Sequence, residues 1–279
     1  MTRTQKLALV YLYLVPPIAA AIGFGIAPIR HQLYIPIWAV HVCLMLIAAS
    51  LLISSGRNEL RILDKVRVGA AFLIIIPWLL FSIFAGMGPP PGTMDGWVAS
   101  ATEQQVRYSL LIAGGLSAFF GFALLKTELQ AMGENVYASL GLTSLGLALP
   151  LFILNMAYWG YYLPEAFRIF VHLPTGKRPD WYVPLKSIFY VISCLEVALT
   201  YLSSIFFARA MRKTGMLSKR SLRCYAIFGT IGLLLVFVPP SWPEPLSIAS
   251  YLVAVPAIPF IMPYFMGVRL LHFFENSVS

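Results

Sequence analysis

The residue with the clearest chemical potential in this sequence is a glutamate in the middle of an apolar stretch. The stretch runs from Lys186 to Met211 and is long and apolar enough to cross a bilayer as one helix. Glu196 lies about ten residues from its start, near the expected membrane midplane. An ionisable group at that depth costs a few kcal/mol or more, so we treat Glu196 as the centre of a candidate functional site.

Hydroxyl-bearing residues follow this glutamate along one face of the predicted helix. At 100° per residue they fall within roughly 80° of it on the helical wheel, and they are Ser193, Thr200, Ser203 and Ser204. Desolvation penalises the charged form of a carboxyl group, so a buried one can load and release protons. The stripe therefore predicts a wet path from Glu196 toward the cytoplasm. The alternative is that its hydroxyls bond to their own helix or mediate close packing.

Two further polar residues stand inside predicted spans. His41 lies about one and a half turns from the outer end of its helix, where it is either a hydrogen-bonded interface residue or a contact for a proton or ligand. Asn155 is expected to form a hydrogen bond between helices, and Glu196 is one possible partner. The candidate ligand-binding or proton-binding residues are Glu196, Ser193, Thr200, Ser203, His41 and Asn155.

The composition predicts the environment in which these residues act. Of the 279 residues, 59% are hydrophobic and only 11% are charged, and the mean hydropathy is +0.80. A soluble domain has about 25% charged residues, so this chain has too little polar surface for one. We predict an all-α, polytopic integral membrane protein whose surroundings are the lipid bilayer. The net charge of +9 is then explained by orientation signals and headgroup contacts rather than by nucleic acid.

Hydropathy predicts about eight transmembrane helices joined by short connections. Their expected ranges are 7–29, 36–55, 69–88, 106–125, 138–163, 187–211, 223–240 and 246–270. Most of the 20 lysines and arginines fall on one side if the N-terminus is inside, which predicts that both termini are cytoplasmic. The short loops favour a bacterial inner membrane.

Proline marks two irregular places in this arrangement. The last predicted span contains Pro256, Pro259 and Pro263, so we expect it to be kinked or partly unwound. Broken helices of this kind expose backbone carbonyls to a cavity in transporters. In the long connection before Lys186, residues 165–173 are expected to form a short interfacial helix.

A weak internal repeat divides the chain into two possible halves of four helices, residues 1–133 and 134–279. Tyr34-Ile35-Pro36-Ile37 opens the second span, and Tyr182-Val183-Pro184-Leu185 opens the sixth. The same offset carries Pro91 onto Pro239, and both lie in proline clusters that follow a span. Four is an even number of crossings, so the halves would be parallel, related by an axis along the membrane normal.

Several kinds of chemistry have no sequence support. There is no acidic pair for Mg²⁺, no histidine cluster or HExxH for zinc, and no lysine inside a span for a Schiff base. The sequence thus predicts no metal and no cofactor, and it argues more against an enzyme than for one. We expect a proton-linked small-molecule transporter that uses Glu196. A non-catalytic sensor-like module or a subunit of a homo-oligomer or larger complex is the alternative, and a lipid-modifying enzyme is the third.

Overall fold

The protein is a bundle of long helices in this computed structural model, which describes residues 2–25, 29, 31–53, 62–173 and 178–278. No strand occurs among these residues. The helices are α1 (Arg3–Gly25), α2 (His31–Ile53), α3 (Ile62–Phe81), α4 (Phe84–Met87), α5 (Met94–Ala99), α6 (Ala101–Ala131), α7 (Val136–Ala157), the π-helical turn η2 (Tyr158–Tyr162), α8 (Leu163–Phe170), α9 (Tyr182–Lys213), α10 (Lys219–Leu235), α11 (Leu246–Ala254) and α12 (Ile261–Val278). The all-α fold is therefore confirmed.

Five helical stretches in the described part of the chain are long and apolar enough to cross a membrane. They are Arg3–Gly23, Gln32–Ile53, Ala101–Ala131, Val136–Phe170 and Tyr182–Lys213. In a bilayer each backbone amide must find its partner within the segment, and a continuous apolar helix meets that need. The other predicted spans are less regular. The first turns of α3 contain the charged residues Asp64, Lys65 and Arg67. α10 has 17 residues, and the last predicted span is split into α11 and α12.

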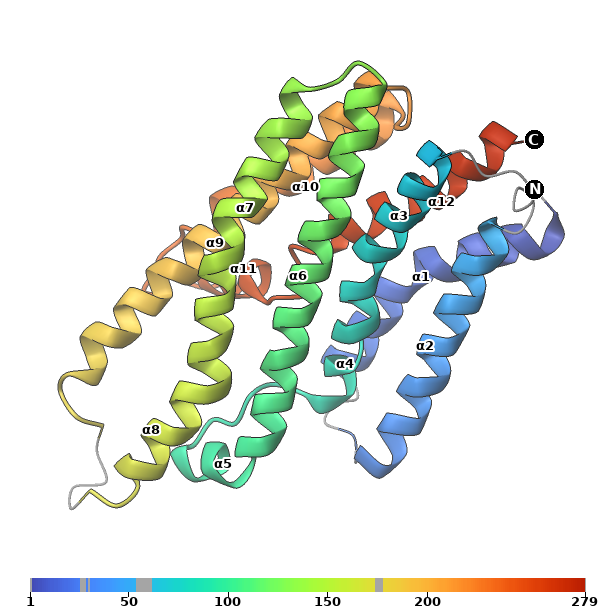
Figure 1. Cartoon of the computed structure of the whole chain (residues 1–279). Coiled ribbons are helices and arrows are strands. Elements are labelled where there is room, and N and C mark those ends of the chain that lie inside the picture. Colours follow the sequence, from blue (N-terminus) through green and yellow to red (C-terminus); the bar gives the residue numbers. More distant parts are fainter. Residues whose placement is uncertain (1, 26–28, 30, 54–61, 174–177, 279) are drawn as a thin grey trace.

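α7 packs between α6 and α9, and α3 packs on α6 (Figure 1). Small residues allow these close approaches. A Cβ atom added at Gly141 on α7 would lie 2.7 Å from Cδ2 of Phe207 on α9. One added at Gly115 on α6 would lie 2.7 Å from Cε1 of Phe152 on α7. The aromatic rings thus fill the hollows that the glycines leave.

The proline-rich last span is broken, as the sequence predicts. α11 ends at Ala254 and α12 begins at Ile261, with turns between them. The indole of Trp78 on α3 donates to the carbonyl of Phe260 at 2.9 Å, and the Tyr264 amide donates to the same carbonyl at 3.0 Å, so the start of α12 is held against α3. The expected short helix in residues 165–173 is present as α8, which continues from α7 through the turn η2.

The first two helices and the glutamate-bearing helix occupy opposite sides of the bundle. In Figure 1, α1 and α2 lie at the right, α9 lies at the left, and α3 and α6 stand between them. α2 packs on α1 and α12, whereas α9 packs mainly on α7 and α10. α1 begins and α12 ends at the upper right of the same view. This layout separates His41 from Glu196, the two ionisable residues that the sequence analysis singles out inside predicted spans.

Candidate functional site

The glutamate of α9 is buried against α7, and an asparagine meets it there. Glu196 is 3% exposed, and Asn155 on α7 is also 3% exposed. The side-chain amide of Asn155 donates from Nδ2 to Oε1 of Glu196 at 2.9 Å. The close packing of the two helices places these residues opposite each other, although 41 positions separate them in the sequence. The interhelical hydrogen bond expected of Asn155 is therefore present.

A tryptophan four residues after Asn155, just beyond the end of α7, completes this chain of hydrogen bonds. Nε1 of Trp159, in η2, donates to Oδ1 of Asn155 at 3.1 Å. An indole nitrogen is a donor only, so Oδ1 of Asn155 must be the acceptor and Nδ2 must face Glu196. The amide orientation is thus set by the order of the bonds. Oε1 of Glu196 accepts, and a proton on this carboxyl group belongs on Oε2.

The second oxygen of the carboxyl group is unsatisfied. Oε2 of Glu196 is buried and has no hydrogen-bond partner among the described residues. Beside Glu196 lies a cavity of about 10 Å³, and its other lining residues are Phe152, Val197, Thr200, Pro256, Pro259 and Phe260. That volume accommodates about one water molecule. The cavity in this conformation can hold about one water molecule, and it is too small for an organic ligand.

The break between α11 and α12 forms one wall of this cavity. Pro256, Pro259 and Phe260 belong to the turns of the break, and all three line the space next to Glu196. The proline cluster and the intramembrane glutamate, which the sequence singles out separately, are thus parts of one site. A helix interrupted beside a buried carboxyl group is an arrangement used by ion-coupled transporters.

Three hydroxyl groups of the predicted stripe donate to backbone carbonyls. Thr200 Oγ1 donates to the Glu196 carbonyl at 2.8 Å, and Ser204 Oγ donates to the Thr200 carbonyl at 3.0 Å. Ser203 Oγ reaches across to the Gly141 carbonyl on α7 at 2.8 Å. All three residues are buried, whereas Ser193 is half-buried. The stripe is packed in this conformation rather than open as a wet path, and Ser203 helps to hold α9 on α7.

The histidine of α2 belongs to a different part of the protein. Nδ1 of His41 lies 2.8 Å from the hydroxyl of Tyr11 on α1, and the two rings meet edge to face. His41 is half-buried, and its helix lies across the bundle from α9 (Figure 1). The structure therefore brings Glu196, Asn155, Thr200 and Ser203 together and leaves His41 outside the group.

No metal centre is evident in the described part of the chain. Within these residues, no group of three or more histidine, cysteine, aspartate or glutamate side chains is placed to hold a metal ion. The lining beside Glu196 supplies one carboxyl group, one hydroxyl and mostly apolar surface. Such a donor set suits a proton better than a metal cation, which takes several oxygen ligands.

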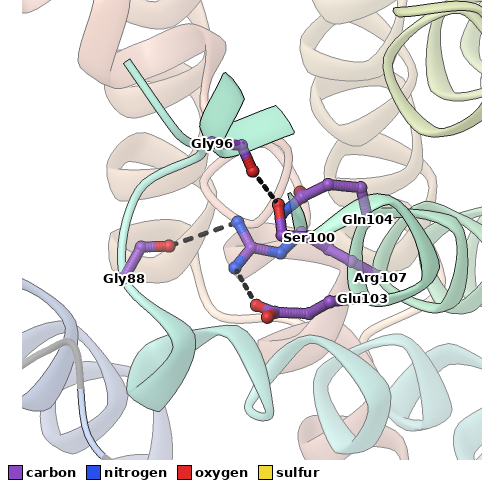
Figure 2. A network of polar contacts seen from close by, with 6 residues as sticks. All are labelled: Gly88, Gly96, Ser100, Glu103, Gln104 and Arg107. Atoms are coloured by element: carbon purple, nitrogen blue, oxygen red, sulfur yellow. Dashed lines mark hydrogen bonds and ion pairs between the residues drawn. The ribbon is translucent and has the colours of Figure 1, made fainter. Parts of the chain in front are cut away.

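A second buried polar cluster lies where α6 begins, and none of its residues is among the candidates predicted from the sequence. Nη1 of Arg107 donates to the Gly88 carbonyl at 3.2 Å, and Nη2 lies 3.5 Å from Oε1 of Glu103 (Figure 2). Oγ of Ser100 donates to the Gly96 carbonyl at 2.7 Å and accepts from Nε2 of Gln104 at 3.2 Å. Arg107 is 5% exposed. The cluster fastens the segment between α4 and α6 onto α6.

Trp159 is not among the candidate residues predicted from the sequence, although it forms a hydrogen bond with one of them, Asn155. The signal was present, since Trp159 follows Asn155 by four positions and therefore lies on the same helical face. Comparison of the chain with protein-family models, with curated proteins and with solved structures finds no match in any of the three. The site is accordingly interpreted from its own geometry.

Proposed function

We propose that this protein is a proton-linked transporter of a small molecule and that Glu196 is its proton-binding residue. One observation carries the proposal: Glu196 is buried with an open carboxyl oxygen beside a water-sized cavity, and the proline-broken segment between α11 and α12 forms a wall of that cavity. An intramembrane carboxyl group is costly, and in transport proteins it marks an ion or proton pathway. A broken helix supplies the element that can move around it.

Each residue of this site has its own role in binding and releasing a proton. The Asn155 amide donates to Oε1 in both protonation states and stabilises the carboxylate more strongly, because hydrogen bonds to charged groups are the stronger ones. Oε2 takes the proton, which removes the charge from the membrane interior. Phe152 and Phe260 line the cavity in the conformation seen here. Rearrangement of the α11–α12 turns would open it to one side.

The membrane arrangement belongs to the same proposal. We propose eight crossings, with both termini in the cytoplasm of a cell whose inner membrane holds the protein. The start of α1 and the end of α12 lie at the same end of the bundle in Figure 1, which supports an even number of crossings. The excess of lysine and arginine on one side supports the orientation. The division into two parallel halves, residues 1–133 and 134–279, stays a prediction.

A non-catalytic membrane module, such as a sensor-like binder or a subunit of a complex, is the second candidate. The bonded hydroxyls of Thr200, Ser203 and Ser204 favour it, because they need no water. In that case Glu196 stays protonated and Asn155 simply joins two helices. A lipid-modifying enzyme has less support, because the lining beside Glu196 offers no second acid or base.

Water access to the cavity distinguishes the two candidates. The experiment uses Thr200→Cys in a chain whose Cys43, Cys194 and Cys224 have been replaced by serine, in oriented membrane vesicles. An impermeant thiol reagent is added to one side at a time. The transporter proposal expects Thr200→Cys to be labelled from at least one side, because the cavity must open during the cycle. Failure of labelling from both sides would contradict it and favour the module.

The controls come from the same chain. Arg220→Cys and Asp95→Cys are both at exposed positions, one in the first turn of α10 and one in α5, and they report reagent access on the two sides. Thr143→Cys lies on α7, two residues from the Gly141 carbonyl that Ser203 contacts, but its side chain is exposed on the bundle surface. It should remain unlabelled if lipid covers that surface.

A further inference from the structure

We propose that Trp159 is a positioning residue that fixes the amide of Asn155 and thereby lowers the affinity of Glu196 for a proton. The inference deepens the proposed function by naming what regulates its proton site. The inference rests on two consecutive hydrogen bonds. Nε1 of Trp159 donates to Oδ1 of Asn155 at 3.1 Å, and Nδ2 of Asn155 donates to Oε1 of Glu196 at 2.9 Å. Each bond has only one possible direction once the indole is in place.

The indole itself is held by aromatic neighbours on other helices. Its ring centroid lies 5.9 Å from that of Trp97 on α5 and 6.4 Å from that of Tyr108 on α6. A Cβ atom added at the neighbouring Gly160 would lie 2.6 Å from Cβ of Tyr108, so glycine allows η2 to approach α6 closely. π-helical turns are frequent at functional sites, and this one carries Trp159. These ring contacts support the indole orientation that donates to Asn155, and Trp159 is 37% exposed.

Without this anchor the amide of Asn155 is free to turn over. A turned amide would present Oδ1 to Glu196, where it repels a carboxylate and accepts a hydrogen bond from a protonated carboxyl group. With the anchor, Nδ2 is the group presented, and it favours the charged form. Trp159 thus holds Asn155 in the orientation that makes proton release from Glu196 easier.

The remaining surroundings of Glu196 contribute little charge. Phe152 from α7 and the residues Pro256, Pro259 and Phe260 from the α11–α12 turns do not titrate. On α9 itself, the titratable neighbours along the helix are Cys194 and Tyr201, both buried. The cavity lining carries no lysine, arginine or second acid. The orientation of one amide is therefore the main polar influence on this carboxyl group.

The test measures the protonation of Glu196 directly by infrared difference spectroscopy of the purified full-length protein in lipid vesicles. The carboxylic acid C=O band that disappears in Glu196→Gln reports the protonated form, and its intensity is followed against pH. Trp159→Phe keeps a ring but loses the N–H donor. We expect its titration midpoint to rise by about one pH unit, from the difference between a charge-assisted and a neutral hydrogen bond.

Two further variants make the result decisive. Asn155→Leu removes the donor to Glu196 outright and should raise the midpoint by at least as much as Trp159→Phe. Trp181→Phe changes an exposed tryptophan at the start of α9 and should leave the midpoint at the wild-type value. A wild-type midpoint in Trp159→Phe together with a raised one in Asn155→Leu would overturn the role of Trp159, as would equal shifts in Trp159→Phe and Trp181→Phe.

The outcome is separate from that of the transport proposal. A raised midpoint in Trp159→Phe supports the positioning role even if Thr200→Cys is never labelled, because protonation is read without transport. Conversely, labelling of Thr200→Cys with an unchanged midpoint in Trp159→Phe supports a water-accessible site and rejects the positioning role. A C=O band of Glu196 that does not change with pH in any of these proteins rejects both.

Discussion

Replacing Gly141 by alanine is expected to weaken the packing of α7 on α9, which aligns Asn155 with Glu196. The new Cβ atom would lie 2.7 Å from Cδ2 of Phe207, which is closer than carbon atoms approach without displacement. Phe207 is fully buried, and its ring centroid lies 4.4 Å from that of Phe122, so it has little room to move. Overpacking of this kind costs about 1–3 kcal/mol. The better helix propensity of alanine offsets about 1 kcal/mol, which leaves a net loss of up to about 2 kcal/mol.

The assay uses a native cysteine of the same helix pair as its reporter. Cys194 on α9 is 8% exposed, whereas Cys43 and Cys224 are exposed and are first replaced by serine. A fluorogenic thiol reagent then reports the exposure of Cys194 as the protein is heated in lipid–detergent micelles. We expect the midpoint of Gly141→Ala to fall by several degrees.

Gly146→Ala on the same helix is the matched control. Its Cβ atom would lie 3.6 Å from Cε2 of Phe119, an ordinary van der Waals contact. We expect its midpoint to equal or exceed that of the starting protein, because alanine is the better helix former. If Gly141→Ala were as stable as Gly146→Ala, the reasoning about close packing between α7 and α9 would be refuted.

Three other predictions concern single polar groups. Glu196→Gln should cost less than about 1 kcal/mol of unfolding free energy, because it keeps an acceptor for Asn155. Glu196→Leu should cost about 1–3 kcal/mol, because it leaves the Asn155 donor unsatisfied. The Cys194 assay measures both. Burial raises the pKa of Glu134, but the Tyr137 amide at 2.7 Å and Lys213 at 3.0 Å outweigh it and hold this pKa below its usual value of 4.5. The resulting stability is present above about pH 4.5 and is lost as the pH falls through the lower folded-state pKa. The melting midpoint should therefore fall more steeply with acid in the wild-type protein than in Glu134→Gln. Parallel curves of melting midpoint against pH would contradict this. Arg107→Gln should speed hydrogen exchange in residues 88–99 by releasing the Gly88 carbonyl, with exchange in α9 unchanged, as measured by mass spectrometry.

The sequence predicts the helices of this protein better than it predicts their neighbours. Continuous hydropathy identifies α9, and helical periodicity identifies the face that carries Glu196. The break at Pro256 and Pro259 also follows from local chemistry, because proline lacks the donor that a helix needs. These features depend only on residues close in the chain.

The pairing of distant side chains depends on how helices are rotated against each other, and local patterns do not contain that rotation. Asn155 is expected to find an interhelical partner, but the choice of Glu196 rests on the contact of Gly141 with Phe207. The π-helical turn that carries Trp159 has no reliable local signature. The burial of Arg107 likewise depends on how the segment after α4 folds back on α6.

The lengths of the central helices have a consequence for the membrane that surrounds them. α6 has 31 residues, α9 has 32, and the continuous helix Val136–Phe170 has 35. At 1.5 Å per residue they measure about 46, 48 and 52 Å, compared with a hydrocarbon thickness of about 30 Å. These helices must tilt steeply or extend beyond the headgroups, and either choice makes the bundle sensitive to hydrophobic mismatch. Acyl-chain length in the host bilayer is therefore a physical variable that acts on the α7–α9 crossing angle, and through it on the distance between Asn155 and Glu196.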